Sequence, residues 1–154
     1  MLNIVVPMAG GGIRFKNKGY LEPKPLIKIK GEPMIKIVIN NLKPICDHRF
    51  IFICQSEHLL KHDLKSIIES NTKSSKIISV KNVTAGPASS VLLAEEYINN
   101  NNPLMIANCD QYIEEDINLY LSKSYHYDGY IMTMQASDPK WSFVKFDNDN
   151  NIIE

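Results

Sequence analysis

The sequence predicts an α/β fold in which a mostly parallel sheet carries helices on both faces. Two observations predict this class: short runs rich in Ile and Val alternate with segments of helical periodicity, and the connections between them are short. A third observation bears on function. The first apolar run, residues 2–6, leads directly into three consecutive glycines, and ligands of such sheets bind at the carboxyl ends of the strands.

The expected strands are runs of apolar and β-branched residues. Buried strands are expected at residues 2–6, 49–54, 76–80, 104–110 and 130–135. Residues 26–30 alternate apolar and charged side chains, which indicates a short strand or an extended arm. Residues 141–146 alternate like a strand with one wetter face, residues 147–151 form a tight turn, and residues 152–154 begin a further strand.

The expected helices lie between these strands. Pro33 stands at the first helical position, and an apolar stripe follows it at residues 34, 35, 38, 39 and 42. Ser56 is expected to cap a helix that continues to about residue 70. A glycine-containing turn at residues 84–90 leads into a helix at 91–98, and a further helix is expected at residues 117–123.

The composition is that of an ordinary globular protein. The chain has 154 residues, of which 44% are hydrophobic and 22% charged, enough for one domain with a real core. The 17 basic and 17 acidic side chains balance to a net charge of zero. This balance disfavours nucleic acid or an anionic membrane surface as a bulk partner.

Cysteine and histidine usage gives no sign of a disulfide framework or a zinc site. Cys46, Cys54 and Cys109 are odd in number and lack Cys-x-x-Cys spacing, which favours a reducing cytoplasm; Cys54 is expected in the core. The four histidines, including the pair His58 and His62, are expected at the surface. With no basic leader and no apolar stretch of roughly 20 residues, we expect a cytoplasmic protein that does not insert into membranes.

Three features should meet at the carboxyl ends of the strands: the loop Gly10–Arg14, the turn Gly86–Ser90, and Asp110. Glycines let the backbone approach a ligand closely, and their N–H groups can point at an anion. Arg14 and Lys24 would supply countercharge for a polyphosphate. A glycine triplet after a strand is, by itself, more often only a turn.

Two familiar phosphate-binding motifs do not fit this loop. A P-loop needs Gly-Lys-Ser/Thr after its glycines, whereas this chain has Gly12-Ile13-Arg14-Phe15. A dinucleotide-binding fingerprint needs a third glycine where Phe15 stands. Gly10-x-Gly12-x-Arg14 is followed instead by Pro23-Lys24-Pro25-Leu26.

This combination resembles the signature of the nucleotidyltransferases that activate sugar phosphates, also called sugar-nucleotide pyrophosphorylases. Residues 86–94 look like that family's nucleotide-contacting turn and helix, residues 108–110 like its metal-bearing strand end, and residues 141–144 like its strand near the acceptor. The resemblance implies a Rossmann-like three-layer α/β/α sandwich with a mostly parallel mixed sheet, of the nucleotide-diphospho-sugar transferase type. It also implies transfer of a nucleotidyl group to a phosphorylated acceptor, with release of pyrophosphate.

The resemblance implies a role for each motif residue. Arg14 would hold the β- and γ-phosphates, Lys24 would stabilise charge between acceptor and α-phosphate, and Asp110 would bind Mg²⁺. The residues implied to bind the nucleotide are Met8, Ala9, Gly10, Gly11, Gly12, Ile13, Gly86, Ser89 and Ser90. The structural alternatives are a surface role for Arg14 and Lys24, and helix capping by Asp110. Ser89 and Ser90 could simply occupy the first turn of a helix.

The substrate and the extent of the domain remain expectations. The sequence around Ser90 looks like the cytidylyl branch, which favours CTP over UTP or dTTP, and the acceptor is a sugar phosphate or small alcohol phosphate, used for capsule or cell-surface polysaccharide synthesis. Residues 1–154 are expected to form one nucleotide-binding domain without the acceptor-binding carboxyl-terminal part. Weak activity, weak Mg²⁺ binding and association into a homo-oligomer would follow.

Two other functions are carried as alternatives. The first is a non-catalytic nucleotide-binding or assembly module. The second, a nucleotide-sugar-dependent glycosyltransferase, is disfavoured because such folds typically have Asp-x-Asp where this chain has Asn108-Cys109-Asp110.

Overall fold

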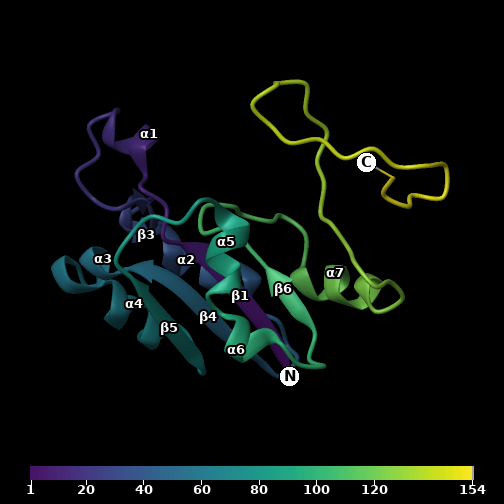
Figure 1. Cartoon of the computed structure of the whole chain (residues 1–154), viewed down its shortest axis with the longest axis horizontal. Helices are drawn as coiled ribbons and strands as arrows, with labels where there is room; N and C mark the ends of the chain where they lie inside the picture. Colours follow the sequence, from purple (N-terminus) through teal and green to yellow (C-terminus); the bar gives the residue numbers. More distant parts are fainter. Residues whose placement is uncertain (154) are drawn as a thin grey trace. The chain divides into compact units, whose positions relative to one another are not determined.

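A four-stranded, entirely parallel sheet forms the centre of the fold (Figure 1). The computed structural model describes residues 1–153. The sheet has the order β5-β4-β1-β6 and consists of β1 (Leu2–Met8), β4 (His48–Gln55), β5 (Ser75–Val80) and β6 (Leu104–Ile106). Because every pair is parallel, all four carboxyl ends lie at the same edge of the sheet.

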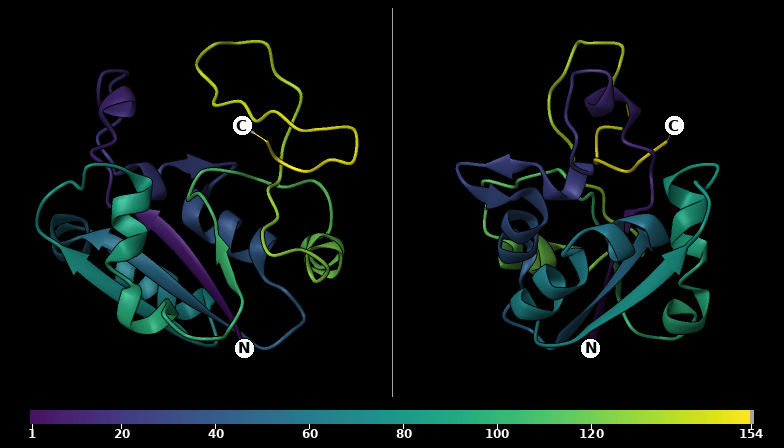
Figure 2. Two further views of the ribbon diagram at one scale, coloured as in Figure 1. Left: turned by 45° about the vertical axis from the view of Figure 1, so that its right-hand side comes forward. Right: turned by 90° about the vertical axis from the view of Figure 1, so that its left-hand side faces the viewer.

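The strand residues alternate between two buried cores. On one face, side chains of β1 and β4 such as Val6 and Phe52 pack with α2 (Met34–Leu42), α4 (Leu64–Asn71) and Ile117 of α7 (Ile117–Ser124). On the other face, Val5 and Ile51 pack against α5 (Pro87–Leu92) and α6 (Glu95–Ile98). Figure 2 shows helices on both sides of the sheet. The predicted three-layer α/β/α architecture is therefore confirmed.

The helix predicted from the apolar stripe forms as α2, but it begins at Met34, one residue later than predicted. Met34, Ile35, Val38, Ile39 and Leu42 are all buried on one side of α2. Pro33 is not the first helical residue: its backbone is extended, with φ −57° and ψ 135°, and it pairs in the short hairpin of β2 (Lys28–Ile29) and β3 (Glu32–Pro33). Extension there is compatible with proline, whose φ is confined near −65° in either conformation.

Two expected helices are each divided in the structure. The segment after β4 forms α3 (Ser56–Lys61) and α4, separated at His62, where the backbone is extended. Ser56 does not cap α3; its hydroxyl lies 2.8 Å from Ser79 Oγ and donates to the carbonyl of Val80 at 3.0 Å. The segment expected at 91–98 forms α5, which begins at Pro87, and α6. The apolar periodicity continues across both breaks, so the pattern did not reveal them.

The prediction that all four histidines lie at the surface is wrong for His58. It is only 7% exposed, because α3 lies against β4 and β5. Burial is the main cause that lowers the pKa of its imidazole, with a further contribution from His62. Cys54, in contrast, lies in the core as predicted, and burial raises the pKa of its thiol to about 12.

The chain divides into two compact units, Met1–Ser122 and a second that begins at Lys123. In the second unit the strands predicted at 130–135 and 141–146 do not form. Phe146 makes only an isolated antiparallel bridge to Ile152. The intervening turn is confirmed: the carboxylate of Asp147 accepts the N–H groups of Asp149 and Asn151 at 2.9 Å each. A run of alternating apolar and polar residues forms a strand only where a neighbouring strand pairs with its backbone.

β6 is also shorter than its apolar run. Strand pairing ends at Ile106, and Cys109 and Asp110 follow in a turn. Within the described residues, no helix has the length and apolar character to cross a membrane.

Candidate active site

The glycine loop leaves the carboxyl end of β1 and turns into α1 (Ile13–Lys16). Gly12 has φ 62°, in the left-handed region that disfavours residues with a side chain. A Cβ placed on Gly12 would lie 4.0 Å from Cβ of Lys24, and one on Gly11 would lie 3.9 Å from Val83. The loop therefore lies between the Lys24 segment and the connection from β5 to α5.

Lys24 and Asp110, far apart in the sequence, form an ion pair. Nζ of Lys24 lies 2.5 Å from Oδ2 of Asp110, and the two side chains are 27% and 34% exposed. Nζ also lies 5.6 Å from the centre of the Phe15 ring. Lys24 opens a short 3₁₀ turn, Lys24–Leu26, whose Pro25 and Leu26 are buried. The buried Pro25 and Leu26 hold Lys24 beside Asp110, the predicted metal ligand that follows β6.

The other predicted residues of the glycine loop differ in accessibility. Met8 and Ala9 are only 4% and 1% exposed, so their side chains belong to the core and only their backbone could reach a ligand. Ile13 is 68% exposed. Arg14 is exposed on α1, so its guanidinium is accessible to an anion.

The turn Gly86–Ser90 is held by hydroxyl groups. Ser90 is 3% exposed; its Oγ lies 2.6 Å from Thr84 Oγ1 and donates to the carbonyl of Gly86 at 3.3 Å. The Thr84 hydroxyl also donates to that carbonyl, at 3.2 Å. Ser89 is exposed. The two serines thus differ: Ser90 supports the turn, whereas Ser89 presents its side chain to solvent.

Sequence reasoning missed Gln55, the last residue of β4. Its side-chain amide donates to the carbonyl of Ala9 at 2.8 Å and to that of Gly10 at 3.1 Å. Sequence reasoning also missed the role of Thr84 in the turn Gly86–Ser90. Each is an ordinary polar residue at a strand end or in a loop, and only its three-dimensional neighbours distinguish it.

The donor set at this edge fits Mg²⁺ only together with a substrate. Within the part of the chain that the structure describes, no three His, Cys, Asp or Glu side chains gather to hold a metal. Mg²⁺ commonly binds one or two carboxylates, with water and substrate phosphates completing its shell. Asp110 fits such a single carboxylate. Neighbouring Cys109 does not, because burial raises the pKa of its thiol to about 11 and keeps it protonated.

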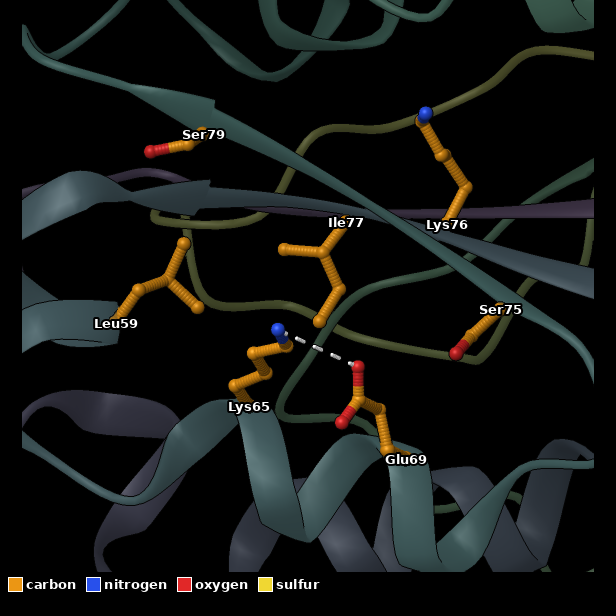
Figure 3. A pocket seen from close by; sticks show the side chains of 7 residues that line it. All are labelled: Leu59, Lys65, Glu69, Ser75, Lys76, Ile77 and Ser79. Atoms are coloured by element: carbon orange, nitrogen blue, oxygen red, sulfur yellow. Dashed lines mark ion pairs between the residues drawn. The ribbon is translucent and has the colours of Figure 1, made fainter.

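A separate hollow of about 350 Å³ lies beside α4 and the edge strand β5 (Figure 3). Lys65 and Glu69 of α4 form an ion pair of 3.9 Å there. Lys76 lines the hollow but points away from this pair in Figure 3, and its Nζ lies 5.0 Å from the centre of the Tyr97 ring. No predicted site residue lines this hollow.

Comparison with curated proteins finds two relatives at low identity. The chain is 23% identical over 156 residues to the bifunctional protein GlmU of Methanocaldococcus jannaschii, and 23% identical over 155 residues to that of Methanococcus aeolicus. Each alignment covers 99% of this chain and 35% of the relative. The chain therefore spans about a third of the length of these curated relatives.

Solved structures share the fold. HddC from Yersinia pseudotuberculosis has a TM-score of 0.75 at 22% identity, covering 100% of this chain and 69% of HddC. The nucleoside-diphosphate-sugar pyrophosphorylase from Vibrio cholerae RC9 has a TM-score of 0.67 at 24% identity, covering 92% and 60% of the two chains. The inositol-1-phosphate CTP transferase from T. maritima has a TM-score of 0.57 at 21% identity, covering 70% and 43%.

These structures confirm the Rossmann-like α/β architecture predicted from the sequence. The family model described as the MobA-like NTP transferase domain matches residues 4–148, nearly the whole chain. The chain belongs to the MobA-like NTP transferase domain family, as its resemblance to the sugar-phosphate nucleotidyltransferases predicted.

Proposed function

We propose that this chain supplies the nucleotide-binding part of an enzyme that transfers a nucleotidyl group from a nucleoside triphosphate to a phosphorylated acceptor. The observation that carries the proposal is the contact between Lys24 and Asp110 at the edge where the glycine loop leaves the sheet. A cation, a carboxylate and a glycine-rich loop at one rim are the groups that phosphate transfer requires.

In the proposed reaction, a phosphate oxygen of the acceptor attacks the α-phosphorus of the nucleotide. A new P–O bond forms, the bond from the α-phosphorus to the oxygen bridging to the β-phosphate breaks, and pyrophosphate leaves with that electron pair. Lys24 would offset charge that builds between acceptor and α-phosphate, and its ion pair with Asp110 supports this role. Arg14, exposed on α1, can use its fork of donors to hold the leaving phosphates.

Asp110 would hold Mg²⁺, which when bound neutralises phosphate charge. The resting ion pair between Lys24 and Asp110 then has a simple role: each side chain keeps the other's charge balanced until phosphates and metal enter. Gly86 and Ser89 would lie against the nucleotide, while Ser90 supports their turn from within. Backbone N–H groups between Ala9 and Ile13 would complete the phosphate site.

For the substrates we propose CTP, with UTP and dTTP as competitors, and a sugar phosphate or small alcohol phosphate as acceptor. The segment Ser89-Ser90-Val91-Leu92 supports CTP through its resemblance to cytidylyl enzymes. One similar fold is that of a CTP transferase, but another similar structure is complexed with UDP-glucose, so the fold itself does not select a base. Synthesis of capsule or other surface polysaccharide is the process we propose for the product.

The test is a matrix of nucleotides against acceptors, with pyrophosphate release as the measurement. It is run on the 154-residue chain. We expect release with one preferred pair, dependent on Mg²⁺. Absence of release from every pair would contradict the proposal.

A non-catalytic nucleotide-binding module is the second candidate. The observation that favours it is that, among the described residues, no group of three His, Cys, Asp or Glu side chains gathers to hold a metal. Nucleotide affinity without pyrophosphate release from any nucleotide and acceptor pair would favour this candidate over the enzyme.

A further inference from the structure

We propose that Gln55 is a positioning residue that sets the orientation of the glycine-loop peptides, so that the N–H groups of Gly10 and Gly11 face the phosphates of the nucleotide. The inference rests on the proposed function of the loop as a triphosphate site. Gln55 lies on β4, not on the loop, and belongs to none of the motifs that the sequence singled out.

Gln55 makes a pair of hydrogen bonds to the glycine loop. A primary amide nitrogen carries two hydrogens, and Nε2 donates to the two successive carbonyls of Ala9 and Gly10 at 2.8 and 3.1 Å. Both carbonyls therefore point towards the end of β4. One side chain thus determines the direction of two neighbouring peptide groups.

The geometry of the peptide group determines where the adjoining N–H groups point. In a planar trans peptide the C=O and the following N–H point in opposite directions. Because the carbonyls of Ala9 and Gly10 face Gln55, the N–H groups of Gly10 and Gly11 face away from it. Within the described part of the chain, neither N–H donates to a backbone carbonyl or a side chain. Two aligned, unpaired donors on one side of a glycine loop form a site for an anion.

A loop of three glycines needs support from outside the loop. Glycine has the widest backbone freedom of any residue, so three in succession do not hold their own peptide orientations. Ordering the loop only when the nucleotide arrives would weaken binding, and an existing hydrogen-bonded support removes that cost. The next residue, Ser56, ties the same strand end to Ser79 and Val80 of β5 instead, so Gln55 is the support directed at the glycine loop.

The side chain of Gln55 is not part of the packing that stabilises the sheet. β1 and β4 are paired from Leu2–His48 through Met8–Cys54, and both strands are buried. The pairing of β4 with β1 ends before Gln55, whose backbone pairs with Val80 of β5 while its side chain is partly exposed. Loss of its amide should therefore leave the sheet intact and affect the loop.

The experiment compares binding of CTP, UTP and dTTP, and of the matching nucleosides, by wild type and Gln55→Met. Met keeps the length and approximate volume of Gln but donates no hydrogen bond. We expect affinity for the preferred triphosphate to fall about tenfold or more, while nucleoside affinity and the melting temperature stay close to wild type. Asn71→Leu is the matched control, because it removes an amide whose nitrogen also donates twice, to Ile67 and Ser70 at the end of α4.

A second variant and a spectroscopic measurement guard against loss of folding. Gln55→Asn keeps the amide but is one methylene too short, so it should show the same selective loss. In wild type, inorganic tripolyphosphate should shift the amide NMR signals of Gly10 and Gly11, and both variants should weaken this response. Equal losses for triphosphate and nucleoside, or unchanged triphosphate affinity, would overturn the inference while leaving the proposed function intact. A wild-type chain that binds no triphosphate would refute both.

Discussion

Both compact units of this chain contain strand-forming runs, but only the first pairs them into a sheet. In the unit Met1–Ser122, apolar runs pair into a parallel sheet, and residues such as Val6 and Phe52 are completely buried. In the unit that begins at Lys123, comparable runs remain irregular, and Ile131 and Met134 are 56% and 62% exposed. A strand pattern alone does not make a strand. It becomes one only when a neighbour pairs its backbone and covers its apolar face.

Removing a core side chain of the first unit should have a larger effect on stability than any change in the second unit. Phe52→Ala removes a completely buried ring that stacks on Phe50 with centroids 5.6 Å apart. We expect it to lower the free energy of unfolding by about 3–5 kcal/mol, measured by urea denaturation. A loss below about 1 kcal/mol would mean that this sheet is not the stabilising element.

The second test asks whether the chemistry belongs to the first unit. Lys24→Ala should reduce pyrophosphate release by about 10²–10³-fold, the usual effect of removing one donor that stabilises developing charge. Stability should change by less than about 1 kcal/mol, because the ion pair with Asp110 is partly exposed. Lys28→Ala, at a nearby exposed lysine of β2, is the control and should retain activity. Equal rates for both variants would remove Lys24 from the mechanism.

The third test concerns backbone conformation in the glycine loop. Gly12→Ala places a side chain at φ 62° and should cost about 1–2 kcal/mol of stability. Gly10→Ala is the matched control, since a Cβ there has no heavy atom within 4 Å. Thermal or urea unfolding without nucleotide separates the two. Equal stabilities would mean that Gly12 does not hold a left-handed conformation in solution.

The smallest effect is expected in the second unit. Ile131→Ser changes a side chain that is already more than half exposed, so the free energy of unfolding should stay within about 0.5 kcal/mol of wild type. Urea unfolding of this variant beside Phe52→Ala makes the comparison quantitative. A large loss would show that residue 131 is buried in solution, by a strand partner or by a second copy of the chain.

The positions of the main elements were largely predictable, because burial on two faces leaves a strong pattern. The Ile- and Val-rich strands β1 and β4 and the stripe of α2 all form where the sequence placed them. The breaks at His62 and between α5 and α6 were not predictable, because apolar periodicity continues across both. The burial of His58 was missed because it depends on which side of α3 meets the sheet.

Some residues of the candidate site could also be predicted from the sequence, and others could not. Gly12 and Lys24 could be predicted from residue type and spacing. A left-handed turn favours glycine, and a positive charge beside phosphate requires a basic residue. Gln55 and Thr84 could not be predicted in this way, because an amide or hydroxyl suits many positions. Their importance comes from the carbonyls that they reach, those of Ala9, Gly10 and Gly86.

By itself, the sequence determined the fold class, the family and the residue types available for phosphate chemistry, because these follow from local periodicity and from motifs of fixed spacing. Only the tertiary structure decided that Lys24 meets Asp110, that Gln55 contacts the glycine loop, and that the runs at 130–135 and 141–146 form no strand. Each of these depends on groups distant in the chain. Their proximity is set by parallel strand pairing and by packing on both faces of the sheet, which no local pattern specifies.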